Sequence, residues 1–157
     1  MKKLFLLFAF ALTAVSGFAQ KGTIELGARL NYSFDKPHAG IGVVGRYQID
    51  RHFRPELTAN FYPAEDGVRS WDLNANLHYI FDITDRFKLY PLGGVGLVNV
   101  HADLVTVDVD DLRSGFNLGG GLQFNITRDL RLTAESYYQF VSDVDRAVLN
   151  VGLVYAF

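Results

Sequence analysis

The sequence predicts an all-β fold, specifically an eight-stranded antiparallel up-and-down transmembrane β-barrel. Three observations predict it. After an apolar leader, the chain divides into eight stretches of alternating apolar and polar residues. Aromatic residues on the apolar phase gather near both ends of these stretches, and the connections between stretches alternate between short and long. The 157 residues are enough for one such domain.

Composition excludes several function classes. Lys+Arg number 15 against 17 Asp+Glu, a formal net charge of -2, so there is no basic field for a nucleic-acid backbone. The chain has no cysteine, which removes disulfides, thiolate metal sites and cysteine nucleophiles. Nucleic acid is therefore not an expected partner.

The first nineteen residues have the pattern of a secretory signal peptide. Lys2 and Lys3 precede the apolar run 4–12, and small residues stand at Gly17 and Ala19. The run is too short for a membrane helix, which takes about 20 apolar residues. We therefore predict a signal peptide over 1–19, cleaved after Ala19, and a barrel domain over 20–157. Losing two lysines leaves 13 basic and 17 acidic residues, a net charge of -4 on the exported chain.

The first four stretches each present one apolar phase, opposed by a phase that, apart from Val44 and Ile80, is polar, charged or glycine. No charged residue falls on the apolar phase, as expected for strands with one face in an apolar environment. In order, the four apolar phases are Ile24, Leu26, Ala28, Leu30 and Tyr32; Ile41, Val43, Gly45, Tyr47 and Ile49; Phe53, Pro55, Leu57, Ala59 and Phe61; and Trp71, Leu73, Ala75, Leu77, Tyr79 and Phe81.

The last four stretches repeat the pattern. Their opposite phases are rich in glycine in the fifth and sixth stretches, which we interpret as allowing tight curvature or close approach. The apolar phases are Phe87, Leu89, Pro91, Gly93, Val95 and Leu97; Phe116, Leu118, Gly120, Leu122, Phe124 and Ile126; Leu130, Leu132, Ala134, Ser136, Tyr138 and Phe140; and Ala147, Leu149, Val151, Leu153, Tyr155 and Phe157.

The aromatic residues favour a membrane barrel over a soluble one. A soluble lipocalin-like carrier would turn the apolar phase inward, whereas an outer-membrane barrel turns it to lipid. Aliphatic residues occupy the strand middles, and rings gather at the strand ends, as at the two membrane interfaces. One predicted belt is Tyr32, Phe61, Trp71, Phe116, Tyr138 and Phe140, and the other is Tyr47, Phe53, Tyr79, Phe81, Phe87, Phe124, Tyr155 and Phe157.

Connection lengths give the expected orientation. With a periplasmic N-terminus, the periplasmic turns are 50–52, 82–86 and 127–129. The outer loops are 33–40, 62–70, 98–115 and the shorter 141–146. Short periplasmic turns and longer external loops are typical of these barrels, and closure is required because lipid cannot satisfy an open sheet edge.

The last strand carries the residues of a family resemblance. Leu149, Val151, Leu153, Tyr155 and the terminal Phe157 look like the C-terminal signature of outer-membrane barrels, and stretches 90–96 and 115–121 look like the family's Gly-rich central strands. The mature chain resembles the small OmpA/OmpX-like outer-membrane β-barrel family. Pro55 and Pro91 depart from ideal strands because each lacks a ladder donor.

This resemblance implies recognition of the last strand by the barrel-assembly machinery. It also implies surroundings of outer-membrane lipids and lipopolysaccharide in a Gram-negative cell envelope. No peptidoglycan-binding domain is expected after Phe157, unlike full-length OmpA, so tethering to the cell wall is not implied.

Charged residues on the polar phases are expected to meet inside the barrel. An eight-stranded barrel is only wide enough for side chains, so these charges must pair with one another or with water. Two interpretations stay open: an ion-paired plug, or a set that exchanges partners and passes small ions, which resembles the gate proposed inside OmpA-type barrels. The predicted lumen set is Glu25, Arg29, Arg46, Arg54, Glu56, Asp72, Lys88, Arg131 and Glu135.

No enzyme signature emerges. Barrel deacylases of lipid A carry a serine two residues after a histidine, but here the residues two after the histidines are Gly40, Arg54, Ile80 and Asp103. We read His78 as a structural, hydrogen-bonded residue. The acidic outer loop lacks the calcium-loop glycine and closing glutamate, so we interpret it as solvated and expect no metal and no cofactor; its residues are His101, Asp103, Asp108, Asp110 and Asp111.

The sequence therefore predicts an integral outer-membrane protein with a structural or surface-interaction role, a plugged polar lumen and no catalytic activity. The alternatives are a low-conductance, porin-like channel and a soluble periplasmic carrier. The outer loops are candidates for contact with an extracellular ligand or a host surface.

Overall fold

The structure is a computed structural model that describes residues 22–35, 37–65, 67–104, 107–143 and 145–157. The predicted signal peptide, residues 1–19, lies outside the described residues. In the described part of the chain, no helix is long and apolar enough to cross a membrane.

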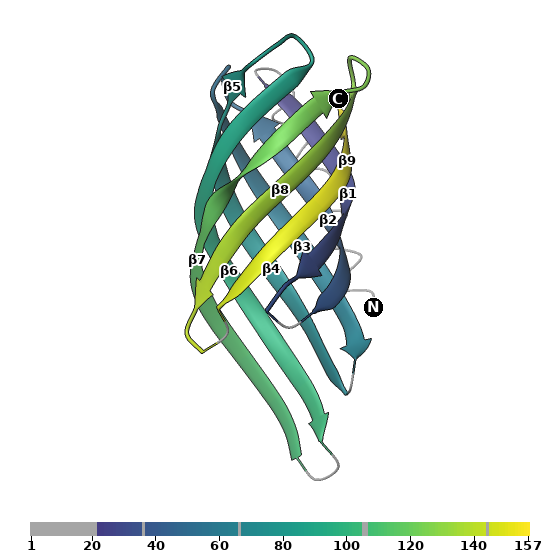
Figure 1. Cartoon of the computed structure of the whole chain (residues 1–157), viewed down its shortest axis with the longest axis vertical. Coiled ribbons are helices and arrows are strands. Elements are labelled where there is room, and N and C mark those ends of the chain that lie inside the picture. Colours follow the sequence, from purple (N-terminus) through teal and green to yellow (C-terminus); the bar gives the residue numbers. More distant parts are fainter. Residues whose placement is uncertain (1–21, 36, 66, 105–106, 144) are drawn as a thin grey trace.

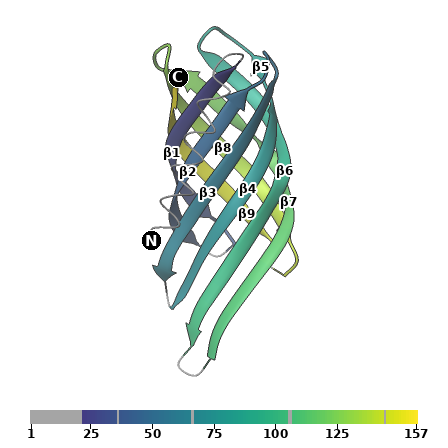
Figure 2. The same cartoon turned by 180° about the vertical axis from the view of Figure 1, so that it is seen from behind.

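Eight long antiparallel strands close into the predicted barrel (Figures 1 and 2). Consecutive long strands are hydrogen-bonded to each other, with β4 pairing to β6 past the short β5, and β1 also pairs with β9. Each of the eight long strands in the described structure therefore has a partner on both sides. The strands are β1 (Thr23–Ser33), β2 (His38–Gln48), β3 (Phe53–Glu65), β4 (Val68–Tyr79), β5 (Phe81–Asp82), β6 (Phe87–Leu104), β7 (Val107–Asn125), β8 (Leu130–Val141) and β9 (Arg146–Ala156).

The two-residue β5 is a continuation of β4 rather than a ninth barrel strand. The β4–β6 ladder ends at His78 opposite Leu92, and β5 resumes it in the same register with Phe81 opposite Leu89. The interruption coincides with Pro91, which has no N–H to donate. Within the gap, the Ile80 N–H donates instead to the His52 carbonyl at 2.7 Å. The predicted fourth stretch, 71–81, is thus one strand with a break near its inner end.

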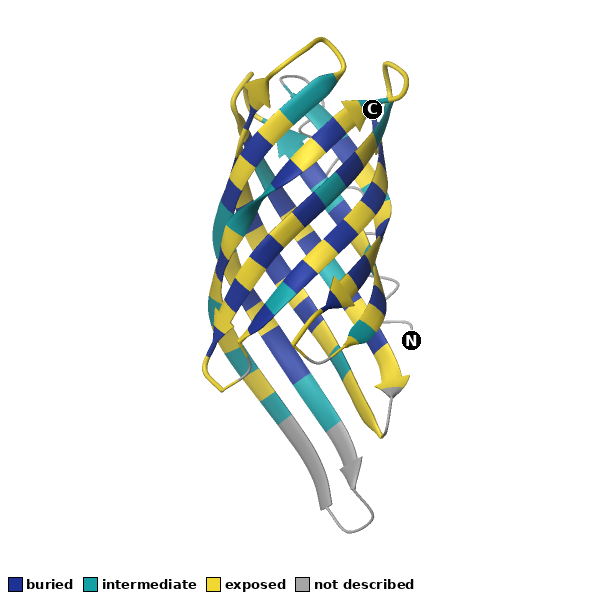
Figure 3. Cartoon of the chain, viewed as in Figure 1, coloured by how far each residue is buried: buried dark blue, intermediate teal, exposed yellow. Residues whose placement is uncertain are grey.

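Burial alternates along every long strand, and the apolar phase faces outward (Figure 3). Leu30, Leu57 and Phe116 are 67–69% exposed, while the polar phases point into the barrel. Exposing such a large apolar surface to water is unfavourable, whereas contact with lipid is favourable. The soluble-carrier alternative, which needs the apolar phase inside, is therefore wrong.

The outer connections are shorter than predicted because the strands run on. The predicted loop 98–115 is a hairpin in which Val98 lies opposite Arg113 and the ladder continues to Leu104 opposite Val107. Most of the predicted loop 62–70 is also strand, ending with Glu65 opposite Val68. Figure 1 shows the β6–β7 hairpin projecting beyond the other strands. In these segments the outward-facing positions are no longer regularly apolar. The sequence pattern of a lipid-facing strand therefore ends before the strand itself does.

The opposite end, which we call the inner end, carries three turns of one design. Asp50 Oδ1 accepts hydrogen bonds from the N–H groups two and three residues later, at 2.7 and 2.8 Å. The Thr84 and Thr127 hydroxyls accept from the same relative positions at 3.0–3.3 Å. An isoleucine precedes each of these residues. The shared pattern is Ile-(Asp/Thr)-x-x-(Phe/Leu), and we call these segments, 49–53, 83–87 and 126–130, the inner turns.

Candidate functional site: the charged lumen

The strands bring the predicted lumen charges together inside the barrel. Glu25, Arg29, Arg46, Arg54, Glu56, Asp72 and Glu135 are all at most 5% exposed. They come from β1, β2, β3, β4 and β8, and each lies on the phase opposite the outward apolar residues. Burial of so many charges requires close pairing, because an isolated buried charge is strongly destabilising.

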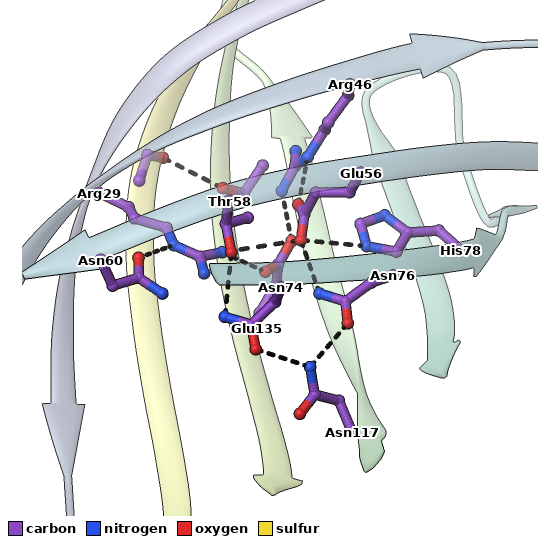
Figure 4. Close-up of polar contacts among 12 residues, drawn as sticks. Arg29, Arg46, Glu56, Thr58, Asn60, Asn74, Asn76, His78, Asn117 and Glu135 are labelled. Carbon is purple, nitrogen blue, oxygen red and sulfur yellow. Dashed lines mark hydrogen bonds and ion pairs between the residues drawn. The ribbon is translucent and has the colours of Figure 1, made fainter. Parts of the chain in front are cut away.

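The centre of the lumen holds four charges that bind one another, Arg29, Arg46, Glu56 and Glu135, which we call the central charge cluster (Figure 4). Arg46 Nε donates to Glu56 Oε2 at 2.7 Å, and Arg46 Nη2 contacts Glu135. Arg29 Nη1 lies 3.2 Å from Glu135 and 3.7 Å from Glu56. The Tyr90 hydroxyl donates to Glu135 at 2.7 Å. Each carboxylate therefore serves both guanidinium groups.

A second group lies toward the outer end around Asp72. Asp72 contacts Arg146 of β9 and accepts hydrogen bonds from Asn60 and Asn74 at 2.5 and 2.6 Å. Arg146 Nε donates to Gln139 Oε1 at 2.8 Å. Arg146 was expected at the end of an outer loop, and its pairing with Asp72 was not predicted from the sequence. Extending the polar phase of the last stretch back from Val148 by one step would have found it.

A third group lies toward the inner end. Arg54 Nη1 donates to Gln123 Oε1 at 2.5 Å, and its Nε and Nη2 lie 3.3 and 3.2 Å from His78 Nδ1. Glu25 contacts Arg131 and lies 3.6 Å from Arg54 Nη1. Lys88, predicted to join the lumen set, is instead half-buried near the rim and pairs with Asp82 of β5 at 2.6 Å.

Glycines on the inward phase make room for large side chains. A Cβ placed on Gly121 would lie 2.6 Å from the Tyr90 ring, whereas one on Gly119 would meet the backbone of β8, at 2.2 Å from the Ser136 carbonyl oxygen. A Cβ on Gly96 would meet the Asn74 and Gln139 amides at 2.4 and 2.5 Å. The glycines predicted to allow close approach thus do so toward the lumen, where their absent side chains are replaced by aromatic and amide groups.

The lumen offers little to a metal ion. Ligand atoms of Glu56, His78 and Glu135 lie within 4.8 Å of one another. Both carboxylates are already neutralised by Arg46 and Arg29, so a divalent cation would add charge to a set that is balanced. His78 Nδ1 accepts from Arg54, which leaves only Nε2, 3.6 Å from Glu56 Oε1, on the side of the carboxylates. The side chains of residues 102–110 lie outside the described ones. The acidic outer segment therefore stays a prediction from the sequence.

A family model described as outer membrane protein beta-barrel domain matches residues 4–157. The chain belongs to this outer-membrane β-barrel family. It is a protein of the outer membrane and sits in its lipid bilayer. The similar structures below are also outer-membrane barrels. A search of curated proteins finds no match.

Solved structures show the same fold at low sequence identity. The N-terminal barrel of Pseudomonas aeruginosa OprF is 17% identical with a TM-score of 0.76, covering 87% of this chain and 99% of that one. Neisserial surface protein A is 17% identical with a TM-score of 0.71, covering 88% and 98%. Ail, the attachment invasion locus protein of Yersinia pestis, is 19% identical with a TM-score of 0.66, covering 87% and 97%.

Proposed function

We propose that this barrel is a structural and surface-interaction protein of the outer membrane whose lumen is plugged by ion pairs. The observation that carries the plug is the central charge cluster, in which two arginines and two glutamates at most 5% exposed bind across the barrel interior. Tyr90, Tyr137 and several amides fill the remaining space against glycines. This filling of the centre by side chains supports a plug rather than a water column.

The export and assembly steps are part of the proposal. The signal peptide is cleaved after Ala19, and the barrel-assembly machinery reads the outward face of β9. That face is accessible in the fold, since Leu149, Val151, Leu153 and Tyr155 are exposed and the terminal Phe157 is 74% exposed. The aromatic belts then lie at the lipid interfaces, with lipopolysaccharide in the outer leaflet.

A low-conductance channel is the second candidate, and the shared partners in the central charge cluster favour it. Because Glu135 contacts Arg29, Arg46 and Tyr90 at once, either arginine can move to Glu56 without losing all of its contacts. Such an exchange would open a narrow path without leaving any charge unpaired.

Planar-bilayer recordings distinguish plug from pore. A plug predicts no channel openings from the folded wild-type protein and no change in Glu56→Gln or Arg131→Ala. A gated pore predicts small openings in the wild type, with altered conductance in both variants. Asp129→Asn, at the inner rim outside the lumen, serves as the matched control. Channel openings in the wild type whose conductance changes in both lumen variants would contradict the plug.

The β6–β7 hairpin supports the surface-interaction role. β8 ends at Val141 opposite Gly115, so beyond that point β7 pairs only with β6 among the described strands. An unpaired strand edge above the membrane is a template for another extended chain. Two of the similar structures belong to proteins named for the cell surface or for attachment, Neisserial surface protein A and Ail.

The role of the hairpin is tested by shortening it. Replacing 101–110 with Asn-Gly joins Val100 to Asp111, which are already opposite each other. We expect this variant to reach the outer membrane in normal amount and to lose attachment of cells to surfaces that the wild type supports. Unchanged attachment would remove the hairpin from the surface role.

A further inference from the structure

The lumen carries one more cation than it has carboxylates. Within the described residues, five arginines lie in the lumen against four carboxylates. Four pairs account for all of the acids: Arg29 with Glu135, Arg46 with Glu56, Arg131 with Glu25, and Arg146 with Asp72. Arg54 is left without a carboxylate of its own.

The direct hydrogen-bond partners of Arg54 are neutral. Its guanidinium contacts His78 Nδ1 and Gln123 Oε1, and its Cζ lies 4.8 Å from the centre of the Tyr90 ring. Glu25 lies 3.6 Å from Arg54 Nη1, and Arg131 also contacts this carboxylate. Arg54 is 1% exposed, so water outside the barrel does little to screen its charge.

Unused hydrogen-bond donors surround the same place. Arg46 Nη1, 4.0 Å from Glu25, is buried and has no hydrogen-bond partner, and neither has Arg131 Nε. His78 Nε2 is also buried and faces Glu56 Oε1 at 3.6 Å, without a hydrogen bond. Since His78 Nδ1 accepts from Arg54, the ring proton is on Nε2, which makes this atom a donor as well. The Glu25 oxygens have ion-pair contacts but no hydrogen bonds of good geometry.

From this surplus charge and these donors, we infer that the inner half of the lumen binds one small monovalent anion, of the size of chloride, beside Arg54. The anion neutralises the fifth arginine and accepts hydrogen bonds from the unused donors. It enters from the inner end, where the Arg131 side chain is 17% exposed. The site holds whether or not the lumen conducts, and so goes beyond the proposed function.

The first test compares chloride with gluconate at equal ionic strength, so that general screening is constant. The folded protein in detergent is heated, and the melting temperature is measured by circular dichroism. We expect chloride to raise the melting temperature saturably, as a ligand of the folded state does, and gluconate to be too large to do so. The ³⁵Cl resonance should also broaden with the folded wild type. Equal melting curves and an unbroadened resonance would mean that only water occupies the site.

Two variants remove the surplus charge in different ways. Arg54→Gln deletes it, and Gln123→Glu places a fixed carboxylate against Arg54 Nη1, which remains informative if Arg54→Gln does not fold. Both should lose the chloride-dependent rise and the ³⁵Cl broadening. Arg51→Gln removes an exposed cation at the inner rim and should retain both. A Gln123→Glu protein that responds to chloride as the wild type does would overturn the inference.

Discussion

At the scale of single residues, the lumen depends on pairs in which one member is large and polar and the other is glycine. Tyr90 illustrates this. Its ring stacks on His78 with centroids 4.5 Å apart, its hydroxyl donates to Glu135, and the Arg54 Cζ lies 4.8 Å from the ring centre. A Cβ at position 121 would lie 2.6 Å from the ring. Polar contacts therefore hold the ring in the space that a side chain at position 121 would need.

Gly121→Ala should destabilise the barrel by about 1–3 kcal/mol, because the new Cβ overpacks against a ring that cannot shift. Gly93→Ala is the matched control in β6. Its Cβ would face outward, with its nearest neighbour 3.9 Å away, and the variant should be as stable as the wild type. Urea unfolding in lipid vesicles measures both. Equal stability of the two variants would show that the lumen is looser than described.

Glu135→Gln tests the central charge cluster at the same scale. The substitution keeps the shape but removes the charge opposite Arg29 and Arg46, which stay buried. Breaking a buried pair in this way costs about 3–5 kcal/mol. Asp85→Asn, exposed in an inner turn, is the control and should leave the urea midpoint unchanged. A Glu135→Gln midpoint close to that of the control would contradict the proposed cluster.

At the scale of elements, the inner turns show one solution used three times. A side-chain oxygen of Asp50, Thr84 or Thr127 caps two backbone N–H groups that would otherwise lack partners. Asp50 differs from the two threonines because it titrates. The N–H groups of Phe53 and His52 lower the pKa of its carboxyl below the usual value.

This makes one turn acid-sensitive. The ionised Asp50 is favoured in the folded state, so its contribution is present above the unfolded pKa of about 3.9 and is lost as the pH falls through the lower folded pKa. In Asp50→Thr the cap is kept without a titrating group. We expect the stability advantage of the wild type over this variant to shrink between about pH 6 and about pH 3. Urea midpoints across that range measure it, and a constant difference would contradict the role of Asp50.

The projecting hairpin and the inner turns should lie on opposite sides of the membrane. An epitope inserted between Leu104 and Val107 should bind antibody on intact cells. The same epitope inserted between Arg128 and Asp129, in an inner turn, should bind only after the outer membrane is permeabilised. Labelling of the inner-turn epitope on intact cells would reverse the assigned orientation.

At the scale of the whole molecule, closure couples every strand to two neighbours. β1 pairs with β9 over nine residues, from Glu25 opposite Ala156 to Ser33 opposite Val148, and β4 pairs with β6. The lumen clusters then link strands that are not neighbours in the sheet, as when Glu135 of β8 binds Arg46 of β2. Unfolding must therefore break the β1–β9 pairing and the lumen clusters together.

The folded barrel should therefore resist detergent until it is heated. In outer-membrane fractions solubilised in sodium dodecyl sulfate, the unboiled protein should run as a compact band that shifts on boiling. A protein found in the soluble fraction, with no shift, would contradict the membrane barrel.

The sequence by itself determined the number of long strands, the phase of each and which phase meets lipid. These properties depend on local alternation and on aromatic placement, as in Leu57 and Phe61 on the outside of β3 beside Glu56 on its inside. The sequence did not predict where long strands end, as at Leu104 and Val107. Apolar alternation identifies only the part of a strand that faces lipid, and these strands continue past it. Which charges meet was decided by the tertiary structure alone. Strand tilt and register place Glu135 on Arg46, Arg146 on Asp72, and Lys88 away from the cluster, and no local pattern encodes distances across a closed barrel.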